Sequence, residues 1–170
     1  TTEGVTEPFE ISPGVIVPAG TYDHSEAIII LFSDQGAPLS ARLTVLAGGF
    51  FGGERTSIAP SVRLRVGEAF NTELSVSHND VTLPGGSFIT DLIISRTSYS
   101  FTPRMFVQSL IQYNDQADLW SANLRFGLLG DANTGLFLVY NDTRGLDGLT
   151  PESAGRSFTV KYSHLFDVFR

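Results

Sequence analysis

The sequence contains no cysteine, and this absence excludes disulfide bridges and thiolate metal sites. Charged residues are also scarce: they make up 17% of the 170 residues, against a usual share of about 25%. No apolar run approaches the roughly 20 consecutive residues that a membrane-spanning helix needs. A chain of this length has room for one domain, and any contact with lipid would have to be made by strands, because lipid accepts only helices and closed barrels.

Positive charge is in the minority, which argues against a nucleic-acid partner. The 11 Lys and Arg residues are outnumbered by 18 Asp and Glu, so the formal net charge is −7. A nucleic-acid-binding surface needs a basic stripe that releases counterions. No Met or signal-type segment precedes Thr1, so we expect the chain to be a processed product or a fragment of a longer precursor.

Alternation of apolar and polar residues with a period of two recurs through most of the sequence, and helical periodicity is almost absent. The clearest run is 119–128, in which Trp120 and Phe126 fall on one face and Asn123 and Arg125 on the other. Similar runs lie at 57–66, 70–77, 105–113 and 158–166. The sequence therefore predicts an all-β fold.

About nine strands are expected from these runs and from less regular ones. Their predicted ranges are 22–33, 40–50, 55–66, 69–80, 87–101, 104–114, 118–129, 135–142 and 156–167. We interpret residues 22–170 as an antiparallel up-and-down meander of about 8–10 strands, barrel-like in form. Residues 1–21, punctuated by Pro and Gly, are expected to form an extended N-terminal arm, with room for one short strand around 9–17.

The expected connections alternate in length. Compact turns are predicted at 67–68, 102–103 and 130–134, and longer connections at 79–86 and 143–155, with 114–118 in between. Transmembrane barrels have short periplasmic turns and longer outer loops, so this alternation favours a periplasmic C-terminus. A soluble sandwich, however, produces the same alternation along each strand.

Aromatic residues gather near the predicted strand ends, where a membrane barrel carries its interfacial girdles. Ordinary β-propensity and core packing would also explain them. They are Tyr99, Phe101, Tyr113, Tyr140, Tyr162 and Phe166.

Several segments carry a resemblance to a known family. They are FEI (9–11), PGVIVPAGTY (13–22), NDVTLPGG (79–86), YSFTPR (99–104), LIQYN (110–114), NLRF (123–126) and LFLVYN (136–141). Together they resemble the C-terminal β-barrel region of the DUF5916 family, bacterial outer-membrane proteins that often carry an N-terminal family-9-like carbohydrate-binding domain. The resemblance covers nearly the whole chain, but only the last portion of a family member.

The resemblance implies a place in the bacterial outer membrane, no chemistry in this segment, and no catalytic or ligand residues to carry over. The sequence departs from the family in two ways. The carbohydrate-binding domain and the earlier strands are missing, so carbohydrate would be bound only through a domain outside this sequence. Arg170 follows the last Phe, where such barrels tend to end on an aromatic residue. Either about eight to ten strands close on themselves, or other elements cover the open edges.

Residues that bind metals or catalyse reactions form no recognisable pattern. His24, His78 and His164 are far apart, and surface positions suit them better than a shared metal site. The carboxylates of segments 131–133 and 141–155 could hold calcium, but their spacing does not follow the EF-hand and favours solvated turns. No phosphate-binding, dinucleotide or hydrolase fingerprint is present. We expect no catalytic, cofactor or metal site, and a protein that is not an enzyme.

The residues singled out as contacts are aromatic. Phe50 and Phe51, flanked by glycines, could anchor in a membrane interface or a partner's groove, or form a tight hairpin with tucked rings. The possible membrane or partner contacts are Phe50, Phe51, Trp120, Phe126, Phe158 and Tyr162. A separate polar set could line a lumen or form a solvated sheet face: Arg63, Arg65, Glu73, Arg125 and Lys161.

Three hypotheses of function follow. The first is a non-enzymatic outer-membrane β-barrel segment with a structural or passive transport role, in contact with the lipid bilayer. The second is a structural subunit derived from such a barrel, which docks on a larger membrane complex from the periplasmic side and stabilises it. The third is a soluble barrel that holds a small apolar ligand in an interior lined by Trp120, Phe126 and Phe158.

Overall fold

The computed structural model of the chain describes residues 1–130, 134–145 and 155–164. These residues form the strands β1 (Thr2–Val5), β2 (Phe9–Ser12), β3 (Val15–Val17), β4 (Gly20–Asp23), β5 (Glu26–Phe32), β6 (Leu39–Phe50), β7 (Gly53–Val66), β8 (Phe70–Leu83), β9 (Gly86–Thr102), β10 (Met105–Asn114), β11 (Leu119–Leu129), β12 (Gly135–Gly145) and β13 (Gly155–Ser163). Among the described residues there is no helix that is long and apolar enough to cross a membrane.

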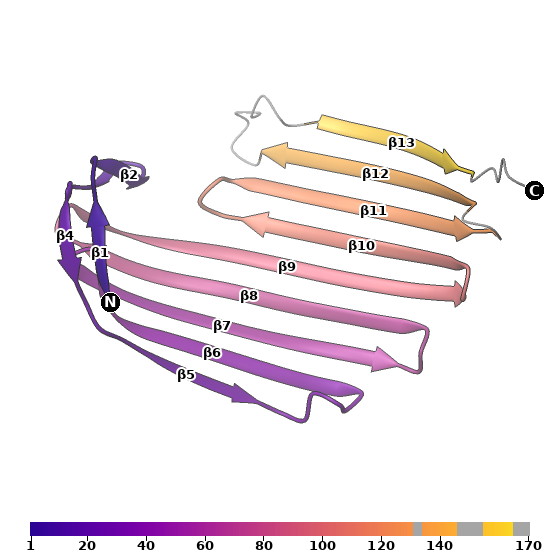
Figure 1. Cartoon of the computed structure of the whole chain (residues 1–170), viewed down its shortest axis with the longest axis horizontal. Helices are drawn as coiled ribbons and strands as arrows, with labels where there is room; N and C mark the ends of the chain where they lie inside the picture. Colours follow the sequence, from indigo (N-terminus) through magenta and orange to yellow (C-terminus); the bar gives the residue numbers. More distant parts are fainter. Residues whose placement is uncertain (131–133, 146–154, 165–170) are drawn as a thin grey trace, which may run out of the picture.

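Strands β5 to β13 form one nine-stranded antiparallel sheet in which spatial order follows sequence order (Figure 1). This confirms the predicted all-β meander of about eight to ten strands. The sheet is not closed into a barrel: within the described ranges, β5 pairs only with β6 and β13 pairs only with β12. Each of these two strands therefore presents one unpaired edge.

The predicted long connection at 79–86 is wrong. Strand β8 continues to Leu83 and β9 begins at Gly86, so only Pro84 and Gly85 remain as the turn. The polar residues of this segment suggested a loop, but Val81 and Leu83 alternate with them and are almost fully buried against the N-terminal arm. Packing against the arm thus extends the hairpin. Of the connection predicted at 143–155, residues 146–154 lie outside the described part of the chain.

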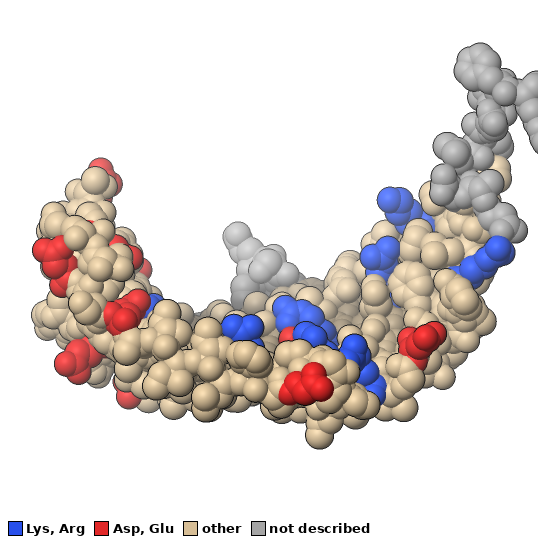
Figure 2. Space-filling view, turned by 60° about the horizontal axis from the view of Figure 1, so that its bottom comes forward, with Lys and Arg blue, Asp and Glu red and all other residues tan. Residues whose placement is uncertain are grey.

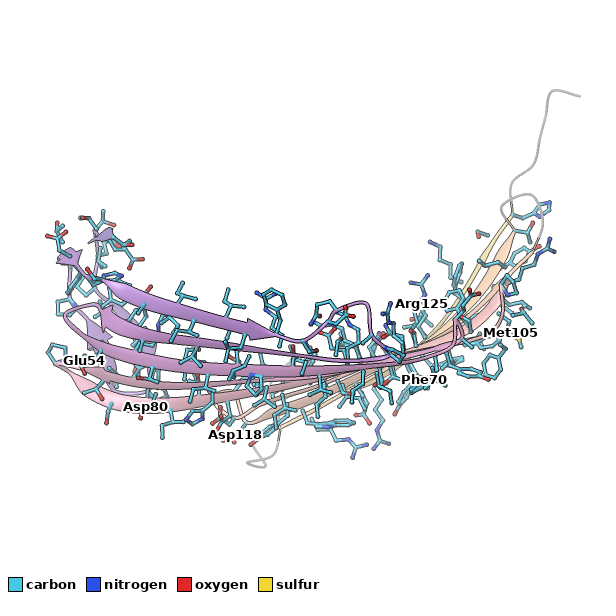
Figure 3. All side chains as sticks on the ribbon, turned by 90° about the horizontal axis from the view of Figure 1, so that it is seen from below. Glu54, Phe70, Asp80, Met105, Asp118 and Arg125 are labelled. Carbon is cyan, nitrogen blue, oxygen red and sulfur yellow. The ribbon has the colours of Figure 1, made fainter. Side chains whose placement is uncertain are left out.

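The nine-stranded sheet bends into an open trough (Figures 2 and 3). Because side chains alternate along each strand, every strand sends one set of residues to the concave face and the other to the convex face. Arg125 lies on the concave side, whereas Phe70, Asp80 and Met105 lie on the convex side (Figure 3). The cross-strand register then assigns the remaining strand residues to one face or the other.

The N-terminal arm folds into two small antiparallel pairs, β1 with β4 and β2 with β3, at one end of the concave face (Figure 1). Val15 and Val17 of the arm pack against Val81 and Leu83 of β8, and these four residues form the buried hydrophobic cluster of the described structure. Val17 is only 1% exposed. The arm thereby covers the end of the trough next to the β6–β7 and β8–β9 turns.

Candidate functional site: the two faces of the curved sheet

The middle of the concave face is a polar band that crosses the sheet. Residues that are cross-strand partners form rows across the sheet, in which neighbouring strands are about 4.8 Å apart. One row runs from β6 to β13 through Ser40, Arg63, Glu73, Arg96, Leu110, Asn123, Asn141 and Ser157. The next row runs from β7 to β13 through Arg65, Asn71, Ser98, Gln108, Arg125, Val139 and Thr159. Polar side chains predominate in both rows.

These two rows floor a hollow of about 520 Å³ on the concave face. Its lining consists of Arg63, Arg65, Asn71, Glu73, Arg96, Thr97, Ser98, Gln108, Ser109, Leu110 and Asn123. Three of these side chains are guanidinium groups, and Glu73 is the one carboxylate among them. The hollow is therefore rich in hydrogen-bond donors and carries positive charge.

The arginines of the band are held in different ways. The Arg63 guanidinium donates to the Glu73 carboxylate, with Nε to Oε2 at 2.9 Å. The Arg65 guanidinium donates to the backbone carbonyls of Gln35, Gly36 and Ala37 in the β5–β6 connection, the shortest bond being 2.6 Å to Gly36. All three bonds are made by Nη2, and carbonyl groups do not neutralise the charge of the guanidinium.

Arg125 and Arg96 carry uncompensated charge into the same band. The Arg125 guanidinium carbon lies 4.7 Å from the ring centre of Phe137 and 5.9 Å from that of Phe106, within the range of cation–π contacts. Among the described residues, Arg96 has no hydrogen-bond or ion-pair partner. Phe106 in turn lies over Gly127, where a Cβ would be only 2.4 Å from the ring.

A chain of side-chain hydrogen bonds continues the band towards the β13 edge. The amide of Asn123 donates to Asn141, and the amide of Asn141 donates to the Ser157 hydroxyl at 3.1 Å. These residues are cross-strand neighbours on β11, β12 and β13. Polar residues on this face are thus paired with one another across strands.

The convex face is apolar over most of its area. Its large side chains include exposed residues from nearly every strand of the sheet: Ile29, Leu31, Ile58, Val62, Leu64, Val66, Leu74, Ile89, Ile93, Tyr99, Phe101, Ile111, Leu124, Leu128, Tyr140, Phe158, Val160 and Tyr162. Monomeric soluble proteins rarely expose a contiguous apolar patch larger than a few hundred Å². Within the described structure nothing packs on this face, so its large apolar side chains are exposed in the isolated chain.

Polar groups on the convex face gather towards the end of the sheet that carries the arm. His78 Nδ1 and Asp91 Oδ1 are 2.7 Å apart on neighbouring strands. Asp142 is 4% exposed and accepts from the Arg144 guanidinium, with Arg156 Nε at 3.4 Å. These pairs satisfy the polar groups beside the apolar area and form its border.

The predicted contact residues separate into two sets. Trp120, Phe126, Phe158 and Tyr162 all lie on the convex face, in rows linked through β11, β12 and β13. Phe158 is 65% exposed and Tyr162 66%. They are part of one continuous apolar surface.

Phe50 and Phe51 lie elsewhere, packed against the arm at the β6–β7 turn. The Phe51 ring makes edge contacts with Phe9 at 5.8 Å and Tyr22 at 5.5 Å, and a tilted contact with Phe50 at 4.6 Å. Both phenylalanines are half-buried. The rings are thus tucked against the arm, and their contact with a membrane or a partner stays a prediction.

Strand β5 is apolar on both faces. Ile29 and Leu31 point to the convex side, and Ile28, Ile30 and Phe32 to the concave side. Exposed fractions in this strand reach 70% at Phe32. A strand of this kind is typical of positions that are covered on both faces, and its outer edge is unpaired.

Two arginines of the concave band, Arg42 and Arg96, were not singled out by the sequence pattern. Arg96 follows the run Leu92–Ile93–Ile94, which is apolar on both faces and hides the phase of the alternation. Its place beside Glu73 follows only from the β8–β9 register. The signal that could have identified it was the recurrence of arginine on the polar face of successive strands.

No metal-binding group appears within the described ranges, where no set of three or more His, Asp or Glu side chains could hold an ion. His78 contacts Asp91, and His164 contacts the Thr134 hydroxyl at 2.8 Å. The calcium candidates at 131–133 and in 146–154 lie outside the described residues.

The fold and its surfaces define an open, curved antiparallel sheet with an apolar convex face and a polar, cationic concave face. Comparison of the chain with family models, curated proteins and solved structures finds no match.

Proposed function

We propose that the chain forms part of the wall of a bacterial outer-membrane β-barrel, with a structural or passive transport role and no enzymatic activity. Its convex face would meet lipid and its concave face a water-filled interior. The observation that carries this proposal is the direction of curvature relative to polarity. Soluble sandwiches and ligand-holding barrels turn their apolar side chains inward, whereas transmembrane barrels turn them outward.

The border of the apolar area supports the proposal because it runs obliquely across the strands. On β7 the first polar convex residue beyond the apolar stretch is Thr56, and on β12 it is Asp142. The row of cross-strand partners that starts at Asp142 meets β7 at Val62, six residues from Thr56. Six residues are about 20 Å along a strand, and five strand spacings are about 24 Å. The border is thus inclined by about 40° to the rows of cross-strand partners. If the border lies in the membrane plane, the strands are tilted by the same angle from the membrane normal, close to the 35–45° of transmembrane barrels.

The height of the apolar area is also consistent with a bilayer. On β11 the convex apolar residues run from Trp120 to Leu128. This stretch is about 26 Å along the strand. If the strand is tilted by about 40° from the membrane normal, the stretch is about 20 Å tall along that normal. Outer-membrane barrels have an apolar band about 25 Å tall.

Aromatic side chains lie near both borders of this area, as expected for interfacial girdles. Tyr113 and Trp120 are cross-strand partners beside the polar border. Tyr99 and Phe101 lie towards the opposite border, with ring centres 4.8 Å apart. Phe166, also predicted for a girdle, lies outside the described residues.

The open edges require further strands, whether from a longer precursor or from another chain. Because lipid does not tolerate unpaired backbone groups, β5 and β13 would pair in the complete wall. The two-sided apolar surface of β5 also favours the second candidate: a structural subunit, derived from such a barrel, that docks on a larger membrane complex from the periplasmic side. The third hypothesis, a ligand-holding soluble barrel, lacks support because Trp120, Phe126 and Phe158 lie on the convex face.

Spin labels on β10 test the first candidate against the second. The chain has no native cysteine, so single cysteines can replace Val107, Ser109 and Ile111 on the convex face and Gln108 and Gln112 on the concave face. The spin-labelled protein is placed in its native membrane lipids. The relaxation rate of each spin label is then measured in the presence of oxygen, which partitions into lipid, and in the presence of a water-soluble nickel chelate.

In the barrel wall, the convex labels respond to oxygen and the concave labels to the nickel chelate, so that the two responses alternate along β10. If convex labels instead respond to neither reagent, another protein covers this face and the docked subunit is correct. Convex labels that respond mainly to the nickel chelate would overturn both candidates.

A further inference from the structure

Positive charge concentrates on the concave face in a chain whose total charge is negative. In strands β5–β13, this face carries seven cationic residues: Arg42, Arg55, Arg63, Arg65, Arg96, Arg125 and Lys161. It carries two carboxylates, Glu26 and Glu73, so its formal charge is +5, against −7 for the whole chain. Figure 2 shows Lys and Arg along the hollow of the trough and Asp and Glu gathered over the end that carries the arm.

Most of these cations lie in one band across the trough. Arg63 and Arg96 share a row with Glu73, and Arg65 and Arg125 share the next row. Arg42 and Lys161 lie one row further out on either side. Rows are about 7 Å apart and neighbouring strands about 4.8 Å apart. Across the strands, Arg65 on β7 and Arg96 on β9 are therefore about 10 Å apart, and Arg125 on β11 lies about 10 Å beyond Arg96.

The compensating charges in the band are too few to neutralise it. Glu73 pairs with Arg63, while Arg65 is bonded to carbonyls and Arg125 lies on aromatic rings. Asp34, in the connection that Arg65 contacts, accepts a bond from the Gly36 backbone amide and forms no ion pair among the described residues. Two guanidinium charges that line the hollow, those of Arg65 and Arg96, are therefore available to an anion, and that of Arg125 lies beside the lining.

Neutral donors surround these charges in the hollow. The amides of Asn71, Gln108 and Asn123 and the hydroxyl of Ser98 line it together with the arginines. Guanidinium groups bind carboxylate and phosphate oxygens through paired N–H donors, and amides and hydroxyls complete the shell of such anions. A hydrated metal cation would meet repulsion at the same place.

We propose that the concave band binds water-soluble oxyanions, whose phosphate or carboxylate groups contact Arg65 and Arg96 in the hollow of the trough, with Arg125 beside its lining. If the chain is a barrel wall, as proposed above, the same band makes the barrel interior favour anions over cations. The acidic arm at the opposite end of the trough directs anions towards the hollow from the side of the β7–β8 and β9–β10 turns.

The test is a calorimetric titration of the detergent-solubilised chain with inorganic pyrophosphate, and in parallel with citrate, at low ionic strength. We expect binding that weakens steeply with added salt, because screening reduces attraction between exposed charges. The double variant Arg96→Gln/Arg125→Gln should raise the dissociation constant about tenfold, which corresponds to about 1.4 kcal/mol. The variant Arg156→Gln, which removes one charge from the convex face, is the control and should leave binding unchanged.

The variant Glu73→Gln provides a test with the opposite sign. It removes the one carboxylate of the hollow and releases Arg63, so pyrophosphate should bind several-fold more tightly. A merely damaged protein would not gain affinity. Tighter binding of pyrophosphate than citrate identifies phosphate groups as the ligand chemistry, and the reverse order identifies carboxylates.

The proposal is overturned if neither anion binds, or if the double variant binds as the native chain does. These outcomes are independent of the spin-label experiment. Convex labels in water combined with anion binding would overturn the barrel and leave the anion site in place. Convex labels in lipid without anion binding would overturn the anion site and leave the barrel in place.

Discussion

At the scale of single residues, the β6–β7 turn joins a strained backbone to a cluster of rings. Phe51 has φ of 45° and Gly52 of 79°, the combination required by a two-residue turn of type I′. Asn and Gly adopt such conformations readily, whereas a bulky side chain does so at a cost. The contacts of the Phe51 ring with Phe9 and Tyr22 of the arm offset this cost. The Phe51 side chain therefore stabilises the position of the arm and not the conformation of the turn.

The substitution Phe51→Asn separates the two roles. Asparagine accepts the left-handed conformation, so the sheet should keep its stability within about 1 kcal/mol, while the arm loses its aromatic anchor and becomes a protease target. Limited proteolysis followed by mass spectrometry should give early cleavage within residues 1–24. Glu68→Ala, in the β7–β8 turn, is the control and should not change cleavage of the arm. An arm that stays protected in the variant would show that the Val15–Val17 cluster holds it alone.

At the scale of the strand, β10 carries the two faces on adjacent residues. Ile111 points to the convex side beside Ala122 and Ser95, and Gln112 points to the concave side beside Ser121 and Ile94. Both positions are on the surface of the isolated chain. Lipid on the convex side would make a charged substitution more destabilising at Ile111 than at Gln112, because a charged side chain on the lipid face of a barrel strand is costly.

The variants Ile111→Arg and Gln112→Arg form a matched pair. In a phospholipid bilayer, Ile111→Arg should lower the free energy of unfolding by about 2–4 kcal/mol, and Gln112→Arg by less than about 1 kcal/mol. Urea titrations followed by the fluorescence of Trp120, the single tryptophan, measure both values. Equal stabilities for the two variants would contradict contact between the convex face and lipid.

At the scale of the whole molecule, the sheet is a trough with two open edges of different character. The β5 edge presents Ile28, Ile30 and Phe32 on the concave side as well as apolar residues on the convex side. The β13 edge presents Ser157, Thr159 and Lys161 on its concave side. A flat, hydrophobic, unpaired edge is a template for pairing with another strand. The trough is thus most complementary to other strands along β5.

We expect the 170-residue chain alone to associate in detergent through this edge. Substitution Ile30→Lys should shift the protein towards monomer, because a lysine on an edge strand opposes pairing and apolar contact. Ser157→Lys places the same charge near the other edge and is the matched control. Size-exclusion chromatography with light scattering gives the masses. Unchanged association in Ile30→Lys together with dissociation in Ser157→Lys would locate the contact at β13.

Much of the architecture was predictable from residue order alone. The period-two alternation, together with less regular runs, predicted about nine strands in antiparallel succession. The alternation also divided residues such as Trp120 and Arg125 between two faces, because pleated backbone sends neighbours to opposite sides. Compact turns at 67–68 and 102–103 were also visible in the composition. By contrast, the extension of β8 to Leu83 depended on burial against an arm about 60 residues earlier in the chain, which local patterns do not record.

The sequence by itself determined which residues share a face, but only the tertiary structure decided which face is convex. Alternation is symmetrical with respect to inside and outside, so the same pattern describes a sandwich and an inverted barrel. The direction of bending arises from twist and coiling summed over nine strands, and no single strand encodes it. The same holds for the cationic hollow, since the register of β7 to β11 brings Arg65 and Arg96 into its lining and Arg125 beside it, from positions up to 60 residues apart.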